Sequence, residues 1–250
     1  MCWSLEASGV VAAAGFAATG YAMYKGDAPA VYATIGYFSV MEALQAATYL
    51  SIDDCSSEGN QLATVLSYLH IAFQPFFINL LALHFVPDRV SRLVAPGVYV
   101  LCFIAAITML VQLYPFEWAG SCEVGRPLCG APLCAISGEW HIAWQVPANG
   151  IGNGLRDVMW LESGYPSYVI MGLIAPVIYG SWRFALFHFL LGPTLAHLLT
   201  DNINEWPAIW CLVSVGLLVV AVESPVRRAL RVRSWMGWGR DPVEDEAGAS

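Results

Sequence analysis

Seven apolar stretches, divided by short polar segments and one long one, constrain this chain more than any other feature of its sequence. A membrane span needs about 20 predominantly apolar residues, and its helical form satisfies every backbone polar group internally. The stretches cover residues 8–24, 29–51, 61–87, 94–114, 164–181, 183–200 and 206–223. We therefore expect an all-α membrane protein, a seven-transmembrane-helix bundle over residues 1–234 with a long loop, 115–163, between helices four and five.

The shortage of charge supports a bilayer rather than water as the surrounding medium. Of the 250 residues, 58% are hydrophobic and 12% are charged, whereas a soluble domain has roughly a quarter of its residues charged. No basic patch suited to nucleic acid is present outside the arginines that follow the last apolar stretch. Residues 235–250 end in several acids, and we expect an interfacial to disordered tail there.

Basic residues give the bundle a direction. They follow the first, third, fifth and seventh stretches, and their positions are Lys25, Arg89, Arg92, Arg183, Arg227, Arg228, Arg231 and Arg233. By the positive-inside rule these segments are cytoplasmic. The N-terminus and the loop 115–163 are then outside and the C-terminus is inside, although Arg126 and Arg156 lie in the outer loop against this trend.

Four cysteines lie in the segments that the charges place outside: Cys55, Cys122, Cys129 and Cys134. A periplasmic or exterior compartment permits disulfides, so we expect two bridges, for which three pairings are possible. A bridge from Cys55 to the long loop would hold that loop over the bundle. The alternative is a zinc site with four cysteine ligands, which the absence of a CxxC pair disfavours.

Polar side chains recur within the apolar stretches at the spacing of one helix face. They are Ser39, Glu42 and Gln45 in the second stretch, Ser67, His70 and Gln74 in the third, and His197 near the end of the sixth. The outer loop adds Glu139, Trp140, His141 and Trp144 in the run GEWHIAW. A rise of 1.5 Å per residue places Glu42, His70 and His197 in the outer half of the bilayer, beneath this loop. Ionisable groups at such depth are costly and usually functional.

Two histidines with a carboxylate are a ligand set typical of zinc or non-haem iron. We therefore predict a metal site of Glu42, His70 and His197, completed by His141 or Asp201, with Glu139 or Asp201 as general base. Ser39, Gln45, Ser67, Gln74, Trp140 and Trp144 would then contact substrate or orient the ligands. A metal-free polar site and a purely structural hydrogen-bond network remain alternatives.

These residues lead to three hypotheses about function. The first is a metal-dependent enzyme acting on a lipid or another apolar small molecule. The second is a non-enzymatic receptor, carrier or proton-coupled transporter that uses Glu42 and His70. The third is an accessory subunit of a larger membrane complex. We do not expect haem, for which His84 and His188 are the nearest approach to a ligand pair. The only lysine, Lys25, lies in a loop, which excludes a retinal Schiff base.

The opening MCWS and the runs HIAFQPFFIN and GEWHIAW resemble an uncharacterised family of seven-helix membrane proteins. The resemblance implies the same fold and carries no function with it.

Overall fold

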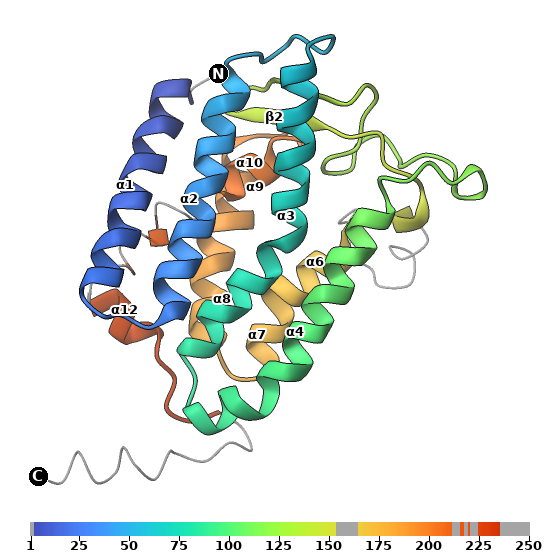
Figure 1. Ribbon diagram of the computed structural model, residues 1–250. Helices are drawn as coiled ribbons and strands as arrows, with labels where there is room; N and C mark the ends of the chain where they lie inside the picture. Colours follow the sequence, from blue (N-terminus) through green and yellow to red (C-terminus); the bar gives the residue numbers. More distant parts are fainter. Residues whose placement is uncertain (1–2, 154–164, 212–215, 218–219, 221–224, 236–250) are drawn as a thin grey trace, which may run out of the picture.

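The computed structural model describes residues 3–153, 165–211, 216–217, 220 and 225–235. Within these ranges the protein is mostly helical, and its long helices stand side by side (Figure 1). One small two-stranded sheet is also present, so the prediction of an all-α chain is wrong in this detail.

The first half of the chain forms four long helices close to the predicted positions. They are α1 (Leu5–Tyr24), α2 (Pro29–Tyr49), α3 (Glu58–His84) and α4 (Asp88–Val111). The Ser4 hydroxyl caps α1 by accepting the backbone N–H of Ala7, and Pro29 occupies the first turn of α2, where a missing N–H costs nothing. Gly15 lets α1 approach α2, since a Cβ there would overlap the Ser39 hydroxyl.

The second half of the chain is also helical, but each of its two long runs contains a π segment. The first run consists of α6 (Pro166–Val169), η2 (Ile170–Ile174) and α7 (Ala175–Ile178). The second consists of α8 (Trp182–Phe189), η3 (Leu190–Thr194) and α9 (Leu195–Leu199). These runs, 166–178 and 182–199, match the fifth and sixth predicted stretches.

Two short helices complete the described part of the C-terminal region. They are α10 (Trp206–Trp210), where the seventh predicted stretch begins, and α12 (Pro225–Leu230). Much of the stretch 206–223 lies outside the described residues, as do the tail residues 236–250.

Pro176 explains how the first run is held together. The N–H of Ala175 bonds to Ile170 and Pro176 has no N–H, so the carbonyls of Met171 and Gly172 lose their normal partners four residues on. Asn79 of α3 donates to the Met171 oxygen at 2.7 Å, and His188 of α8 lies 3.2 Å from the Gly172 oxygen. Side chains from two other helices therefore satisfy the broken backbone.

The outer loop contains a short 3-10 turn, η1 (Glu117–Ala119), and a hairpin of β1 (Cys134–Ser137) and β2 (Ile142–Gln145). The strands are antiparallel, with Cys134 opposite Gln145. Asn60 of α3 binds β1 like a neighbouring strand, because its amide both donates to and accepts from the backbone of Ala135 at 2.8 Å. The hairpin lies at the end of the bundle where α3 begins (Figure 1).

Two disulfides join the four outer cysteines, as predicted. Cys55 pairs with Cys134, which ties the α2–α3 connection to the hairpin, and Cys122 pairs with Cys129 within the loop. Cys102 and Cys211 are buried free thiols. Bridges at this end are compatible with an oxidising compartment.

Two of the described helices, α3 and α4, are long and apolar enough to cross a membrane, judged by length and composition alone. The run 166–178 is apolar but shorter. The observed helices thus support a membrane location more weakly than the seven stretches in the sequence predict.

Candidate functional site

His70, one of the predicted metal ligands, instead joins α3 to α2. Its Nε2 lies 2.8 Å from the backbone oxygen of Tyr37, whose hydroxyl donates to the backbone oxygen of His70 at 2.6 Å. The two rings stack with centroids 3.9 Å apart. This reciprocal contact gives His70 a structural task and holds its ring against α2.

The other polar residues of α2 and α3 are buried between the helices, as their spacing predicts. Glu42, Gln45 and Ser67 are all fully enclosed. The Ser39 hydroxyl donates to the Ile35 backbone oxygen of its own helix at 2.7 Å. The Gln45 amide reaches towards the Ala208 oxygen of α10 at 3.5 Å. Gln45 therefore lies towards α10, whereas Ser39 lies against α1.

His197 lies away from this core. It is exposed, and its ring makes an edge-type contact with Trp206, with ring centroids 5.5 Å apart. The π segment η3 precedes it in the same helical run, and no group of three potential metal ligands forms around it among the described residues.

The predicted metal set is consequently not assembled. Within the described ranges, no three histidine, cysteine, aspartate or glutamate side chains lie close enough to share a metal ion. Glu139 and Asp201, the predicted general bases, are exposed. Metal-dependent catalysis stays a prediction from the sequence that the observed arrangement of these side chains does not support.

His141 is buried in the hairpin and packs against the N-terminal segment. Its Nδ1 accepts the N–H of Ile142 at 2.8 Å and lies 3.2 Å from the Tyr49 hydroxyl. Trp3 stacks on the imidazole, with ring centroids 5.4 Å apart, and on Trp140, with ring centroids 6.5 Å apart. Burial lowers the pKa of His141 to about 3, because an enclosed imidazolium would lose its hydration. The imidazole is therefore neutral at physiological pH.

Glu205, which the predicted site did not include, fastens the hairpin to the bundle. Its carboxylate is fully buried and accepts the backbone N–H groups of Glu139, Trp140 and His141, the last two at 2.8 and 3.0 Å. Three amide donors satisfy such a charge without a cation. An acid followed by Trp206 and Pro207 is a helix N-terminus signal, which could have pointed to Glu205.

A cavity of about 480 Å³ lies between the outer loop and the middle of α3. Its wall comes from α3 and α4, from residues 125–128 of the outer loop, from 165–173 and 189–193 of the two interrupted helical runs, and from 203–210. Most of the lining is aliphatic or aromatic. Of the predicted site residues only Gln74 belongs to this wall, because a cavity depends on helix spacing that the sequence pattern does not report.

Hydrogen bonds engage most of the polar groups at the inner end of this cavity. The Tyr168 hydroxyl donates to Gln74 Oε1 at 2.5 Å, and the Gln74 amide nitrogen lies 3.5 Å from the Cys211 sulfur. The indole N–H of Trp210 donates to Nε2 of His188 at 2.7 Å. These bonds fix the side chains of the wall in place. Among the described residues of the wall, no nucleophilic side chain contacts an unpaired basic group.

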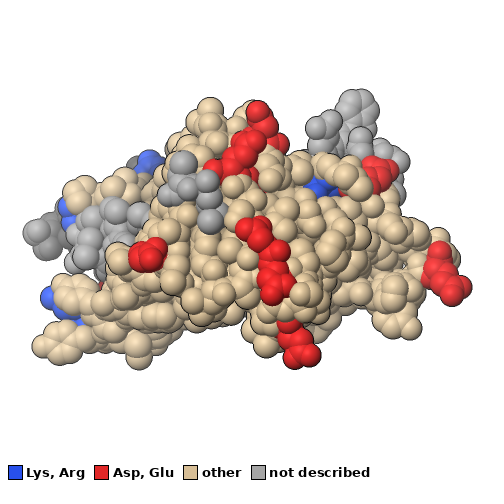
Figure 2. All heavy atoms as spheres, turned by 90° about the horizontal axis from the view of Figure 1, so that it is seen from above, with Lys and Arg blue, Asp and Glu red and all other residues tan. Residues whose placement is uncertain are grey.

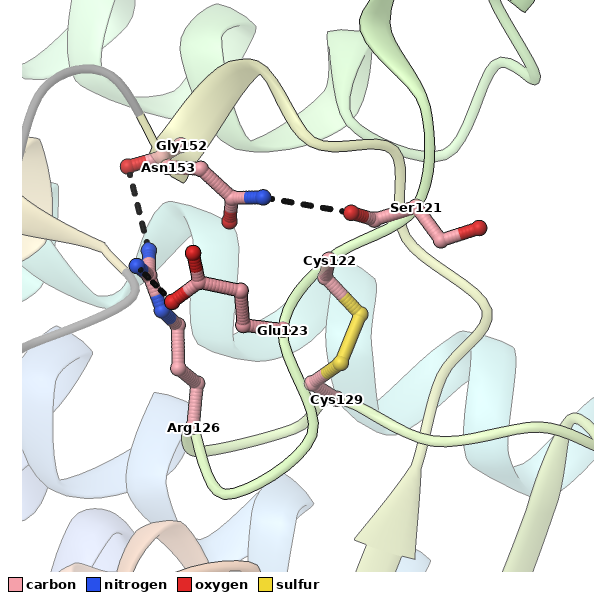
Figure 3. Close-up of polar contacts among 7 residues, drawn as sticks. All are labelled: Ser121, Cys122, Glu123, Arg126, Cys129, Gly152 and Asn153. Atoms are coloured by element: carbon pink, nitrogen blue, oxygen red, sulfur yellow. Dashed lines mark hydrogen bonds and ion pairs between the residues drawn. A yellow bond between two sulfur atoms is a disulfide. The ribbon is translucent and has the colours of Figure 1, made fainter.

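Arg126 borders the outer end of the cavity, and Figure 3 shows its contacts with Glu123 and Gly152. The residue is 5% exposed. Its guanidinium meets the Glu123 carboxylate at 2.6 Å and donates to the Gly152 backbone oxygen at 3.3 Å. The Cys122–Cys129 bridge closes the short loop that carries this ion pair. Arg126, which broke the charge trend in the sequence, is thus part of the cavity wall.

Comparisons with known proteins place the chain in a family without assigning it an activity. A family model described as "Family of unknown function (DUF5765)" matches residues 6–231. No curated protein and no solved structure matches the chain. Because the family model covers most of the sequence, the chain belongs to the family of unknown function DUF5765.

Proposed function

We propose that this chain is an integral membrane protein of seven spans, with its N-terminus outside and its C-terminus in the cytoplasm. The helices observed at the predicted stretches support this topology. So do the apolar side chains that α4 presents to the surroundings, such as Leu101, Phe103 and Ile104, each more than half exposed. Contiguous apolar surface of this kind marks a membrane or protein contact.

The distribution of charge and disulfides supports the same orientation. Acidic side chains are spread over the end of the molecule that carries the hairpin, where few basic ones appear (Figure 2). Lys25, Arg183 and Arg227 lie in or beside the turns at the opposite end. Both disulfides belong to the acidic end, which we place in the periplasm or the exterior.

Within this bundle we propose a binding site for an apolar small molecule, so that the protein acts as a receptor or carrier. The cavity of about 480 Å³ carries the proposal. Ligand sites usually enclose about 300–1,000 Å³ and combine an apolar lining with a few placed polar groups. Gln74, Tyr168 and Arg126 are those groups here.

The surrounding side chains favour binding over catalysis. The predicted general bases Glu139 and Asp201 are not part of the cavity wall. His70, which a proton relay with Glu42 would need, is held in its contact with Tyr37. Tyr168 and Gln74 bond to each other. The wall thus offers shape and fixed polar groups rather than a reactive pair.

Photolabelling with a diazirine-bearing alkane tests this proposal. Protein in lipid nanodiscs is irradiated with the probe, and the labelled peptides are identified by mass spectrometry. We expect labels at 165–173 and 203–210. In the variant Val169→Trp, whose larger side chain fills the cavity, we expect labelling there to fall at least about fivefold, since overpacking removes the space.

The control is Val177→Trp, which makes the same change further along the same helical run, at a position 39% exposed and outside the cavity wall. It should label like the original protein. Equal labelling of the cavity peptides in both variants would show that the probe reads only lipid-facing surface and would overturn the binding site.

A further inference from the structure

The hydrogen-bonding capacity left in the cavity wall consists mainly of donors. A guanidinium has five N–H groups, and the described contacts of Arg126 use one N–H of each terminal nitrogen, which leaves a second N–H on each. Gln74 retains amide N–H capacity beyond its weak contact with Cys211. The indole N–H of Trp206 is occupied by the Thr200 oxygen at 3.2 Å. A ligand that fits this wall therefore supplies acceptor oxygens.

Charge restricts the ligand further. Arg126 already has a counter-ion, since Glu123 lies 2.6 Å from its guanidinium. A second carboxylate would compete with Glu123 for the same cation and would have to give up its own hydration. A neutral carbonyl or ester oxygen can accept an N–H from Arg126 without displacing Glu123. The ion pair thus favours an uncharged head group.

The outer end of the cavity is also held in place. Leu128, next to the wall residues Arg126 and Pro127, is 1% exposed, and the Cys122–Cys129 bridge limits how far this loop can move. Arg126 lines the cavity and is shielded from bulk water. Its remaining terminal N–H groups are therefore costly to leave unpaired, and a ligand oxygen would relieve that cost.

We propose that the cavity takes a neutral lipid-like molecule whose carbonyl or ester oxygen binds Arg126, with its apolar chain along Leu173, Phe189 and Trp210. This inference rests on the proposed function and adds the chemical class of the ligand. In this proposal Arg126 binds the head group of the ligand, and Glu123 disfavours anionic ligands.

Competition against the alkane photolabel tests the ligand class. The competitors share one chain length: hexadecane, methyl palmitate and hexadecanesulfonate, each expressed as mole fraction in the nanodisc bilayer. We expect methyl palmitate to displace the label at roughly tenfold lower mole fraction than hexadecane, since it adds a hydrogen bond to a charged donor. The sulfonate should displace the label less well than the ester.

Two variants identify the groups responsible. Glu123→Gln leaves the guanidinium without this counter-ion, and the sulfonate should then gain about tenfold while the ester changes little. Arg126→Met keeps an apolar wall, and the ester should then match hexadecane. The comparison of competitors in the original protein needs no variant, so a misfolded Arg126→Met would not remove the test.

Three outcomes would overturn the inference. If the ester and hexadecane displace the label equally, or if the sulfonate is preferred in the original protein, the head-group assignment is wrong while the apolar cavity stands. If none of the three competitors displaces the label, the proposed binding function itself fails.

Discussion

Nδ1 of His188 lies 3.2 Å from the carbonyl oxygen of Gly172, the oxygen that Pro176 leaves without its usual backbone partner. On its other side, Nε2 of the same ring accepts the indole N–H of Trp210 at 2.7 Å. One imidazole thereby links both interrupted helical runs to α10, next to the cavity. A neutral ring with its proton on Nδ1 satisfies both contacts.

Replacement of this histidine should weaken the bundle. We expect His188→Leu to lower the free energy of unfolding by about 2–4 kcal/mol, because it leaves the Gly172 oxygen and the Trp210 N–H buried without partners. The measurement is the thermal unfolding midpoint in detergent. His197→Leu is the matched control on the same helical run. Being exposed, it should change stability by less than about 0.5 kcal/mol, and a similar loss in both variants would contradict the assigned role.

The two disulfides should differ in their contribution to stability. Cys55 and Cys134 are 79 residues apart in sequence, whereas Cys122 and Cys129 are 7 apart. By chain entropy the double change Cys55→Ser/Cys134→Ser should cost about 4 kcal/mol and Cys122→Ser/Cys129→Ser about 2 kcal/mol. Unfolding with and without reductant measures both. The second pair should also reduce photolabelling at 165–173, because it loosens the loop of Arg126. The reverse order of stabilities would refute this account of the hairpin bridge.

His141 predicts a dependence of stability on pH. Its pKa is about 3 in the fold against an ordinary value of 6.5, so below about pH 6.5 the unfolded chain takes up a proton that the fold refuses. Stability should therefore be lost as the pH falls from 6.5 towards 3, by up to about 1.4 kcal/mol per pH unit from this residue. His141→Asn should reduce the slope of stability against pH by the amount that corresponds to the uptake of about one proton on unfolding. A slope that does not change on this substitution contradicts the buried neutral imidazole.

The ion pair of Asp27 and Arg227 predicts a second dependence, at lower pH and at the other end of the molecule. The Arg227 guanidinium, 2.6 Å away, holds the pKa of the Asp27 carboxyl below its ordinary value of 3.8. The contribution of the pair is thus present above about pH 4 and is lost as the pH falls through the lowered pKa.

Arg227→Met should cost about 1–2 kcal/mol at neutral pH, since the pair is only partly buried. The exchange Asp27→Arg/Arg227→Asp should recover part of that loss in a double-mutant cycle, measured by thermal unfolding. Independent effects of the two changes would show that the pair does not couple α12 to the α1–α2 turn.

The sequence predicted the ends of the first four helices to within six residues, because each is a long apolar stretch bounded by polar turns. It also predicted that Cys55, Cys122, Cys129 and Cys134 form bridges, since the charges placed them together outside. The hairpin Cys134–Gln145 was not predicted, because four-residue strands in a loop rich in Gly, Pro and Cys carry too little periodicity.

For the candidate site, the sequence predicted which side chains are buried but not which of them lie together. Spacing along α2 and α3 correctly indicated that Glu42, Gln45 and Gln74 are buried. It could not report that His197 is exposed, because the residues at the end of the sixth stretch do not show which side of that helical run faces the bundle. The cavity was missed for the same reason, since its wall combines residues from six segments of the chain.

An experimental density map of the protein in lipid nanodiscs tests the central claim most directly. The account predicts a lipid belt around all seven helical segments, the disulfide-bridged hairpin on one side of it, and an elongated density in the cavity between Arg126 and Gln74. A belt that meets only α3 and α4, or a cavity closed by side chains with no density inside it, would contradict the account.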